Sequence, residues 1–402
     1  MHALYQGYLT SHDWEWNELV KLFHSRCTDD GFLRWLHCLL LMDDSVLLAT
    51  TQQRATEKIK IMIEFCEEYG MEMNFNKTKF MVINGTEYDR TNICVDGKVI
   101  SHCKKYTYLG AAIYEDATFH QFIDEHVSAK SKNVLKFHSF LSKNKDLPYT
   151  IKYRVFEACL LSSILYSSET WLHDRYGKLN TLYMGLVKAL LGVKESCPNN
   201  IALLEGGFCG LQGIIRERQF RFYSKLVNNR SHMTDDPFIH MLSIARENSS
   251  PSARYIDSLL KATDVSFIKS DSEARKEHVR HSAGSKFITY RLLNTELIRH
   301  HIYDDYSIPE FKRICFTRFR TSCHHLKIET GRWSRIARER RLCSCDSKEV
   351  QDEVHVIEAC SHLTNLRASF PGITFTVQGF FEGSVGDIAS FVHQAMDLLE
   401  QI

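Results

Sequence analysis

The sequence lacks a long hydrophobic run. Its longest apolar stretches, residues 35–42 and 158–166, are interrupted and fall well short of the roughly 20 residues needed to span a bilayer. Residues 1–30 show no positively charged start followed by an apolar stretch, so no secretory signal is predicted. These absences predict an intracellular protein, nuclear or cytoplasmic, that is neither secreted nor inserted in a membrane.

The sequence also has little net charge. Its formal charge is +1 over 402 residues, so a polyanionic partner can be inferred only from local charge. Residues 311–342 contain ten Lys or Arg against two Glu, a local charge of +8, and the rest of the chain is therefore at −7. A hydrophobic content of 44% with 25% charged residues is ordinary for a globular protein of two or three domains.

Several enzyme signatures are missing as well. The chain has no G-x-S-x-G motif, P-loop or H-E-x-x-H motif, which gives no support to a hydrolase or nucleoside-triphosphatase. Its 13 cysteines are scattered along a large chain, a distribution that indicates a reducing compartment rather than a disulfide framework.

Short strands and one helix are predicted in the first third of the chain. Residues 36–42 and 45–49 are apolar runs without alternation, typical of strands covered on both faces, and they flank Asp43 and Asp44 at the tip of a β-hairpin. An apolar stripe in residues 52–70 predicts a helix that Gly70 terminates. Further strands are predicted at 80–83, on both sides of Asp96–Gly97, and as a single strand at 104–113.

Helices are predicted from about residue 119 onward. One begins after Pro148, and further helices are expected at 177–191, 211–229 and 286–301, with a linker at 246–255. The buried face predicted for the helix after Pro148 consists of Ile151, Val155, Ala158, Cys159, Leu165 and Tyr166.

Four motifs in order resemble the reverse transcriptase of non-LTR (LINE-type) retrotransposons. "LLLMDDSVLLAT" resembles the metal-binding hairpin of the palm, although Leu41 and Met42 stand where an aromatic residue and Ala are usual. The other three motifs are Gly70, Asn74, Lys77, Thr78 and Lys79; Tyr108, Leu109 and Gly110; and Tyr166, Glu169 and Trp171. A fifth element, "RLCSCDSKEVQDEVHVIEAC", is similar to the family's Cys/His knuckle.

The resemblance implies an α+β fold. A partial reverse transcriptase palm of antiparallel hairpins plus a helix would occupy residues 1–115, followed by a helical thumb at 116–200 and a helical connector at 201–310. A basic region with a small Cys/His segment would complete the chain at 311–402.

The resemblance also implies Mg²⁺ chemistry at the hairpin. Polymerases align the reacting groups with two divalent ions about 4 Å apart, held by carboxylates from separate elements. Asp43 would be the main ligand and Asp44 its weaker neighbour, but the earlier aspartates, Asp13, Asp29 and Asp30, all lie in polar, turn-like surroundings. We therefore predict an N-terminally truncated reverse transcriptase that is inactive unless the missing segment is supplied in trans.

Four residues near the C-terminal end predict a zinc site. Cys343, Cys345, His355 and Cys360 fall within 18 positions and suit a tetrahedral Zn²⁺ ion. The alternative is a set of free thiols, because C-x-C is a tighter spacing than the usual C-x-x-C. Substitute ligands would be Cys323, His324, His325 and His362.

Basic residues predict non-specific binding to RNA or DNA, single-stranded or as a template-primer. Arg332, Arg335, Arg338 and Arg341 recur every third residue and would lie close together on a helix. Arg318 and Arg320 extend the set, and the interleaved aromatic residues Phe311, Phe316, Phe319 and Trp333 suit base stacking. The alternative is a solvated helix with its aromatic residues in the core. By resemblance, Lys77 and Lys79 would contact phosphate; otherwise they lie in an exposed loop.

Three functions remain open from the sequence. The first is a reverse transcriptase (RNA-directed DNA polymerase) fragment that is inactive alone, and the second is a non-enzymatic nucleic-acid-binding protein using the basic region and the Cys/His segment. The third is a pseudogene-like reading frame without a selected role.

Overall fold

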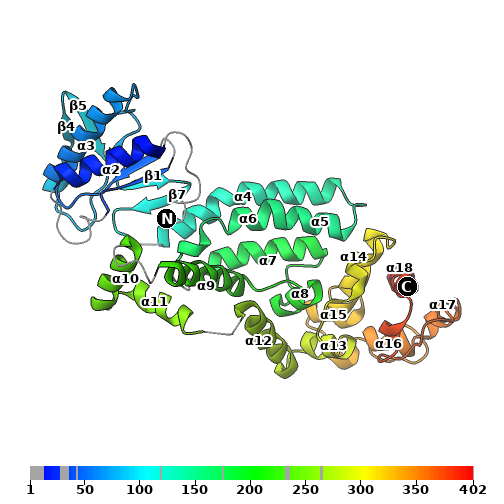
Figure 1. Cartoon of the computed structure of the whole chain (residues 1–402). Helices are drawn as coiled ribbons and strands as arrows, with labels where there is room; N and C mark the ends of the chain where they lie inside the picture. Colours follow the sequence, from blue (N-terminus) through cyan, green and yellow to red (C-terminus); the bar gives the residue numbers. More distant parts are fainter. Residues whose placement is uncertain are drawn as a thin grey trace. The chain divides into compact units, whose positions relative to one another are not determined.

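The computed structural model describes residues 13–27, 36–41, 44–117, 120–173, 176–230, 236–262 and 266–401 (Figure 1). The chain forms two compact units. The first unit comprises the described parts of 1–125, 169–173 and 219–262, and the second those of 126–168, 174–218 and 263–402. The division of the sequence into four regions stays a prediction, since each unit draws on several of them.

A two-stranded hairpin forms the start of the first unit. Strands β1 (Cys38–Leu41) and β2 (Asp44–Leu47) form the predicted antiparallel hairpin, but Asp44, predicted at its tip, is the first residue of β2 and pairs with Leu41. The prediction that both strands are covered on both faces is wrong for the second strand, because Ser45 is exposed. Cys38, Leu40 and Leu47 of this hairpin pack against the two helices described next.

Helix α3 (Gln52–Glu68) organises the first unit by packing on two sides. Its residues Met62, Phe65 and Cys66 pack against Leu19 and Phe23 of helix α2 (Asp13–Arg26) in one buried cluster. From another face of the helix, Ile59 packs against a small sheet whose buried residues are Ile93, Val95 and Ile100. The helix begins after the N-cap Thr51 and ends before Gly70, whose φ of +67° suits glycine, as predicted.

The small sheet consists of β3 (Lys79–Phe80), β5 (Lys98–His102) and β4 (Ile93–Val95), in that order. Strands β4 and β5 form the hairpin predicted around Asp96 and Gly97, and both turn residues have positive φ. The predicted strand at 80–83 is wrong in extent, since only Phe80 of that range pairs with β5.

The single strand predicted at 104–113 is instead a second tight hairpin. Strands β6 (Lys105–Tyr108) and β7 (Ala111–Tyr114) pair with Tyr108 opposite Ala111. Leu109 and Gly110 form the two-residue turn, with φ of +49° and +77°. The prediction failed because a leucine at positive φ gives no turn signal in the sequence.

Helices complete the first unit. Helix α4 (His120–Lys143) begins in this unit and α9 (Leu211–Arg230) ends in it. Tyr223 and Leu226 of α9 pack against α10 (Pro237–Glu247) and α11 (Pro251–Leu260). The predicted linker at 246–255 is wrong, because α10 and α11 occupy most of it. Pro251 stands at the first turn of α11, where the missing N–H costs nothing.

In the second unit, a helical run follows α4 after Pro148. It consists of α5 (Tyr149–Val155), the π-helix η3 (Phe156–Leu161) and α6 (Ser162–Ile164). The predicted buried face is wrong at most of its positions, since Ile151, Ala158, Cys159 and Tyr166 are exposed. The buried residues Lys152, Phe156, Leu160 and Ile164 instead recur every four residues, and Leu165 is buried as predicted.

Packed helices form the rest of this unit. Helix α7 (Gly177–Leu191) has the predicted bounds, but α13 (Ser285–Leu293) ends earlier than predicted. Helix α14 (Glu310–Arg320) packs against the last helix, α18 (Val385–Glu400). The remaining helices are α8 (Asn199–Gly206), α12 (Phe267–His281), α15 (Lys327–Trp333), α16 (Glu353–Glu358) and α17 (Thr364–Ala368).

The structure confirms a mixed α+β fold with few small sheets and many helices. None of the helices in the described part of the chain has the length and apolar character required to cross a bilayer.

Candidate metal centre and nucleic-acid interface

Of the two aspartates in the acidic pair, Asp44 is among the described residues. Asp44 is the first residue of β2 and is exposed, whereas Asp43 lies outside the described residues. Burial raises the pKa of Tyr108, and the negative charge of Asp44 raises it further. The structure therefore brings together residues from two predicted motifs, the acidic pair and the Tyr-Leu-Gly turn.

Asp44 is not part of a multidentate metal site in the described structure. Among the described residues, the one group of three or more His, Cys, Asp or Glu side chains that could hold a metal ion is the Cys/His set. A two-metal centre needs several converging carboxylates. The described residues of this hairpin therefore contain one carboxylate, that of Asp44, for such a centre.

The lysines of the second motif are exposed, Lys77 in the turn before β3 and Lys79 as the first residue of β3. The turn is held by Asn74, whose side-chain oxygen accepts from the Lys77 backbone N–H at 3.2 Å. The Lys77 side chain is exposed, and Lys79 donates from Nζ to Ser101 Oγ at 2.8 Å. Their predicted contact with phosphate stays a prediction.

Trp171, from the fourth motif, is a core residue of the first unit. It is 1% exposed, its ring lies 5.7 Å from that of Phe122 in an edge-on arrangement, and its carbonyl accepts from Gln219 Nε2. Tyr166 of the same motif is half exposed. The tryptophan therefore has a packing role in this structure.

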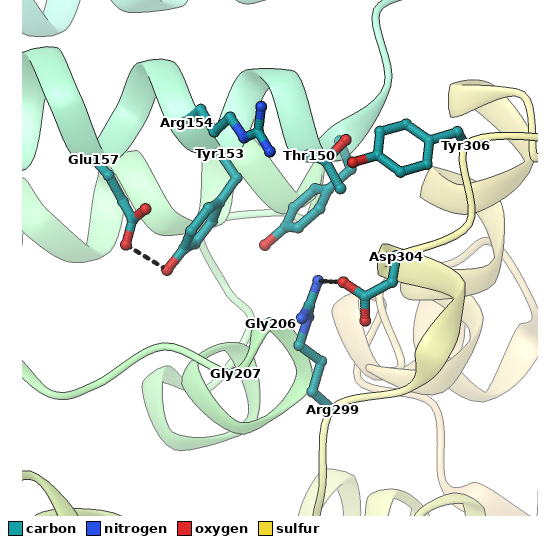
Figure 2. A pocket seen from close by; sticks show the side chains of 10 residues that line it. Thr150, Tyr153, Arg154, Glu157, Gly206, Gly207, Arg299, Asp304 and Tyr306 are labelled. Carbon is teal, nitrogen blue, oxygen red and sulfur yellow. Dashed lines mark hydrogen bonds and ion pairs between the residues drawn. The ribbon is translucent and has the colours of Figure 1, made fainter.

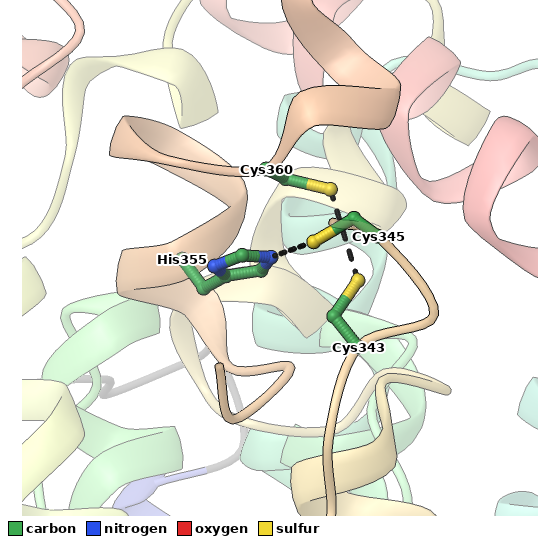
Figure 3. A group of neighbouring side chains, drawn as sticks. All are labelled: Cys343, Cys345, His355 and Cys360. Carbon is green, nitrogen blue, oxygen red and sulfur yellow. Dashed lines mark hydrogen bonds between the residues drawn. The ribbon is translucent and has the colours of Figure 1, made fainter. Parts of the chain in front are cut away.

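The four residues predicted to bind zinc lie together in the second unit (Figure 3). All four are buried, and their ligand atoms lie within 4.8 Å of one another. Cys345 Sγ is 3.3 Å from His355 Nε2, and Cys343 Sγ is 3.8 Å from Cys360 Sγ. Cys343 and Cys345 come from the segment before α16, His355 from α16 itself, and Cys360 from just beyond it.

This donor set fits a tetrahedral zinc ion. Zn–S bonds of about 2.3 Å at tetrahedral angles place sulfur ligands about 3.8 Å apart, close to the Cys343–Cys360 separation. Three thiols and one imidazole are a standard structural donor set, and burial of all four leaves no ligand position open to solvent.

Neighbouring side chains contact two of the ligands, His355 and Cys343. Glu349 Oε2 lies 3.1 Å from His355 Nδ1, which leaves Nε2 facing the sulfur atoms. Carboxylate contacts of this kind fix the ring of metal-binding histidines. Asp352 caps α16 by accepting from the His355 N–H at 3.0 Å, and Gln351 Nε2 lies 3.6 Å from Cys343 Sγ.

Hydrogen bonds favour a thiolate in this set. Burial opposes ionisation of Cys345, but hydrogen bonds with Ser347 and Cys343 outweigh it and lower the pKa of Cys345 to about 5. Burial raises the pKa of Cys360 to about 12, with the adjacent Cys343 adding to the rise. Cys345 therefore ionises more readily than an ordinary cysteine, and binding a metal would require Cys360 to lose its proton.

The substitute ligands lie outside this group. His324 Nε2 contacts the buried Glu353 Oε1 at 2.8 Å, and Ser322 Oγ donates to the same oxygen at 2.6 Å. His362 Nε2 lies 3.2 Å from Ser344 Oγ, and His325 is exposed. Cys323 is buried and forms a hydrogen bond with Cys197, which helps to lower the pKa of Cys323 to about 6.

The arginines predicted to share one helix face do not do so. Helix α15 ends at Trp333, Arg335 has a φ of +56°, and a short 3₁₀ turn holds Arg338. The guanidinium groups of these arginines contact different residues. Arg332 pairs with Glu329, Arg338 Nη2 pairs with Asp352 Oδ2 at 3.1 Å, and Arg335 is exposed.

Two of the predicted nucleic-acid-binding arginines are structural. Arg320 is 2% exposed and donates from Nε to both oxygens of Glu205, so the prediction of a nucleic-acid contact is wrong for it. Its guanidinium lies 5.5 Å from the centre of the Phe316 ring, on the buried side of α14. Arg341 is half-buried, and its guanidinium donates to the carbonyls of Ile336 and Ile328 at 2.6 to 2.8 Å.

The aromatic residues of the basic region are divided between core and surface. Phe316 and Phe319 are fully buried, as the alternative interpretation required, whereas Phe311 and Trp333 are about half exposed. Lys194 Nζ stands 3.9 Å from the centre of the Trp333 ring. Burial lowers the pKa of Lys194, and the nearby charges of Arg318 and Lys286 contribute to the lowering.

Lys194, Arg318 and Trp333 therefore form a basic aromatic patch, hereafter the Trp333 patch. Arg318 is exposed and donates from Nε to the Gly192 carbonyl at 2.7 Å. The sequence analysis missed Lys194 because it precedes Trp333 by well over 100 residues. Glu349 was missed because a lone surface carboxylate carries no signal until the fold sets it beside His355.

Comparison with known families adds one finding. Residues 16–113 match the family described as reverse transcriptase (RNA-dependent DNA polymerase). No curated protein gives a significant match to the sequence. The matched range begins within helix α2, ends within strand β7, and contains three of the four motifs: the acidic pair, the Gly70–Lys79 segment and the Tyr-Leu-Gly turn. Over these residues the chain is similar to reverse transcriptases.

Proposed function

We propose that this chain is the palm and thumb portion of a non-LTR (LINE-type) retrotransposon reverse transcriptase that binds template-primer nucleic acid. The match of residues 16–113 to the reverse transcriptase family carries the proposal. The order of motifs supports the LINE type, because the Tyr-Leu-Gly turn, the Tyr166–Trp171 segment and the Cys/His set all follow the acidic hairpin in the order expected of that branch.

Asp43 and Asp44 would be the Mg²⁺ ligands of this hairpin. Magnesium, when bound by converging carboxylates, neutralises charge on the nucleotide phosphates and activates the attacking hydroxyl. Among the described residues, Asp44 belongs to no group of three or more possible metal ligands. We therefore expect this chain alone to extend no primer.

Nucleic acid would contact the Trp333 patch. Trp333 offers a half-exposed ring for stacking on a base, and Arg318 and Lys194 provide positive charge beside it. Lys77 and Lys79 would contact phosphate from the first unit. Such contacts read no base edge, so binding would be independent of sequence.

Zinc would have a structural role in the second unit. Cys343, Cys345, His355 and Cys360 would hold the ion and tie the segment before α16 to the residue that follows it. This segment is too short to build a core of its own, so metal binding would contribute directly to its folding.

Primer extension on an RNA template tests the proposal directly, with Asp43→Ala and Asp44→Ala variants as controls. We expect the chain to bind the template-primer and to add no nucleotide. Extension that the Asp43→Ala variant abolishes would show that the chain is an active polymerase and would overturn the inactive assignment. Failure to bind any template-primer would overturn the wider proposal.

A second candidate function is a non-enzymatic nucleic-acid-binding protein. The observation that favours it is the location of the Trp333 patch and the Cys/His set in the second unit, outside residues 16–113. Deletion is not needed to separate the two functions. Specific binding to the end of a primer, compared with a blunt duplex of equal length, indicates the polymerase-derived function, whereas equal binding indicates the general one.

A further inference from the structure

A polar pocket of about 330 Å³ lies in the second unit, away from both sites described above (Figure 2). Its walls come from α5 and the π-helix η3, from the glycines that end α8, and from the segment after α13. This volume lies within the range of small-molecule sites, roughly 300 to 1,000 Å³.

Three polar atoms around the pocket are buried without a hydrogen-bond partner in the described structure. They are the Tyr149 hydroxyl, Thr150 Oγ1 and Arg299 Nε. Tyr149 is only 4% exposed, so its hydroxyl has lost contact with bulk water. Leaving a buried polar group without a hydrogen bond costs on the order of 1–3 kcal/mol. A bound ligand that forms hydrogen bonds with these atoms would remove this cost.

These groups favour a ligand that accepts hydrogen bonds. Arg299 Nε can only donate, and the two hydroxyls can donate as well. Arg154, also in the pocket wall, is exposed and forms no ion pair with a described carboxylate. The two acidic residues are already engaged. Asp304 pairs with Arg299 Nη2 at 2.9 Å, and Glu157 accepts from the Tyr153 hydroxyl at 2.8 Å (Figure 2).

Glycine at the end of α8 is needed for this arrangement. Gly207 has a φ of +70°, and a Cβ atom at that position would lie 2.6 Å from Cδ of Arg299. The absence of a side chain thus allows Arg299 to lie directly against the backbone. Its guanidinium is also held over the rings of Tyr149 and Tyr303, at 5.8 and 5.5 Å. Such packing prepositions the arginine before any ligand arrives.

The pocket also presents aromatic rings beside its arginines. Tyr153 is half-buried, and Tyr306 is 61% exposed. A planar base can stack on such rings, and guanidinium groups match phosphate oxygens. We propose that this pocket binds a nucleoside monophosphate unit, with its phosphate held by Arg154, Arg299 and the Tyr149 hydroxyl. The unit would be a free nucleotide or the 5′-phosphorylated end of RNA, which share this chemistry.

This site goes beyond the function proposed above, because its residues lie outside residues 16–113, which match the family, and outside the Trp333 patch. Isothermal titration of the full chain with AMP tests it, with adenosine and inorganic phosphate as partial ligands. We expect one saturable AMP site and binding of each partial ligand weaker by at least about tenfold, since each lacks one of the two recognised groups.

Tyr149→Phe is the sharpest variant. It removes a hydroxyl that has no partner, so the melting temperature should stay the same or rise, while AMP affinity falls by about tenfold. Arg154→Gln should weaken AMP binding by a similar factor without changing stability. Lys143→Gln is the matched control, because it removes an exposed charge at the end of α4, outside the pocket, and should leave AMP affinity unchanged.

A 5′-phosphorylated dinucleotide distinguishes the two sources of the ligand. Tighter binding of the dinucleotide than of AMP assigns the site to an RNA end, and equal or weaker binding assigns it to the free nucleotide; either result supports the proposal. It is overturned if neither AMP nor the dinucleotide saturates, or if phosphate alone binds as tightly as AMP. Wild-type affinity in both Tyr149→Phe and Arg154→Gln would overturn it as well.

Discussion

Arg320 and Glu205 form a buried ion pair in the second unit. Arg320 Nε donates to the two carboxylate oxygens of Glu205 at 3.0 and 3.1 Å, and neither side chain is more than 3% exposed. Glu205 also accepts from the hydroxyls of Tyr290 and Tyr303, each at 3.0 Å. The pair connects α8 to α14. Protein groups donate hydrogen bonds to both oxygens of the Glu205 carboxylate.

Arg320→Gln should destabilise the second unit strongly. Removing one partner leaves a buried carboxylate without its counter-charge, which costs about 3–5 kcal/mol. Urea unfolding should show this loss, and Arg335→Gln, on the exposed side of the same basic region, should change stability by less than about 0.5 kcal/mol. Equal effects of the two substitutions would contradict the buried ion pair and would support the nucleic-acid-binding role predicted for Arg320 from the sequence.

The chain should retain one zinc ion after dialysis. Elemental analysis of the purified protein should find it, and Cys345→Ser should abolish it because the substitution removes a ligand from a four-residue site. Cys323→Ser is the matched control, a buried cysteine outside the group, and should keep the metal. Zinc-free wild-type protein with full stability would contradict the metal assignment.

Glu349 should tune zinc affinity without binding the ion. Its carboxylate contacts His355 Nδ1 at 3.1 Å, and loss of such a contact typically weakens metal binding by about 10–100-fold. Competition with a chelator should therefore show weaker zinc binding in Glu349→Gln. Glu339→Gln, an exposed neighbour in the basic region, should bind zinc like the wild type.

Stability should fall in mild acid because of His300. Burial lowers the pKa of His300 to about 3, with the nearby Arg320 adding to the effect. The unfolded chain therefore takes up a proton between about pH 6.5 and pH 3 that the folded chain does not, so this contribution to stability is present above pH 6.5 and lost as the pH falls.

The slope should reach at most about 1.4 kcal/mol per pH unit for this one proton. His300→Asn removes the titrating group and keeps a side chain that can accept from the Ile302 N–H, as His300 Nδ1 does at 3.2 Å. Unfolding measured at pH 7 and pH 5 should show a smaller difference in the variant. An unchanged difference would assign the acid sensitivity to other groups.

The sequence predicted elements well where a local pattern carried the information. The stripe of α3, its terminal Gly70 and the Asp96–Gly97 turn all have signals within a few residues, and the structure confirms them. The Leu109–Gly110 turn had no such signal, because leucine is rarely found at positive φ. The buried face after Pro148 also differed, since a π-helix shifts the register and tertiary contacts bury Lys152.

The site residues could likewise be predicted where they lie close together in the sequence, and not where tertiary structure decides their surroundings. The Cys/His set could be predicted because its four ligands are close in sequence, and the fold then brought them within 4.8 Å. The arginines could not be sorted from spacing alone, because Arg320 and Arg318 differ by two positions on α14 and yet one faces Glu205 and the other the surface. Lys194 and Trp333 are joined only by the tertiary structure.

Template-primer binding at two salt concentrations, followed by fluorescence anisotropy, tests the central claim most directly. We predict affinity that falls steeply with salt, a slope of log affinity against log salt reduced by about 1 in Arg318→Gln, and a loss of about 1–3 kcal/mol with little change of slope in Trp333→Ala. Absence of binding at low salt, or wild-type affinity and slope in both variants, would contradict the account.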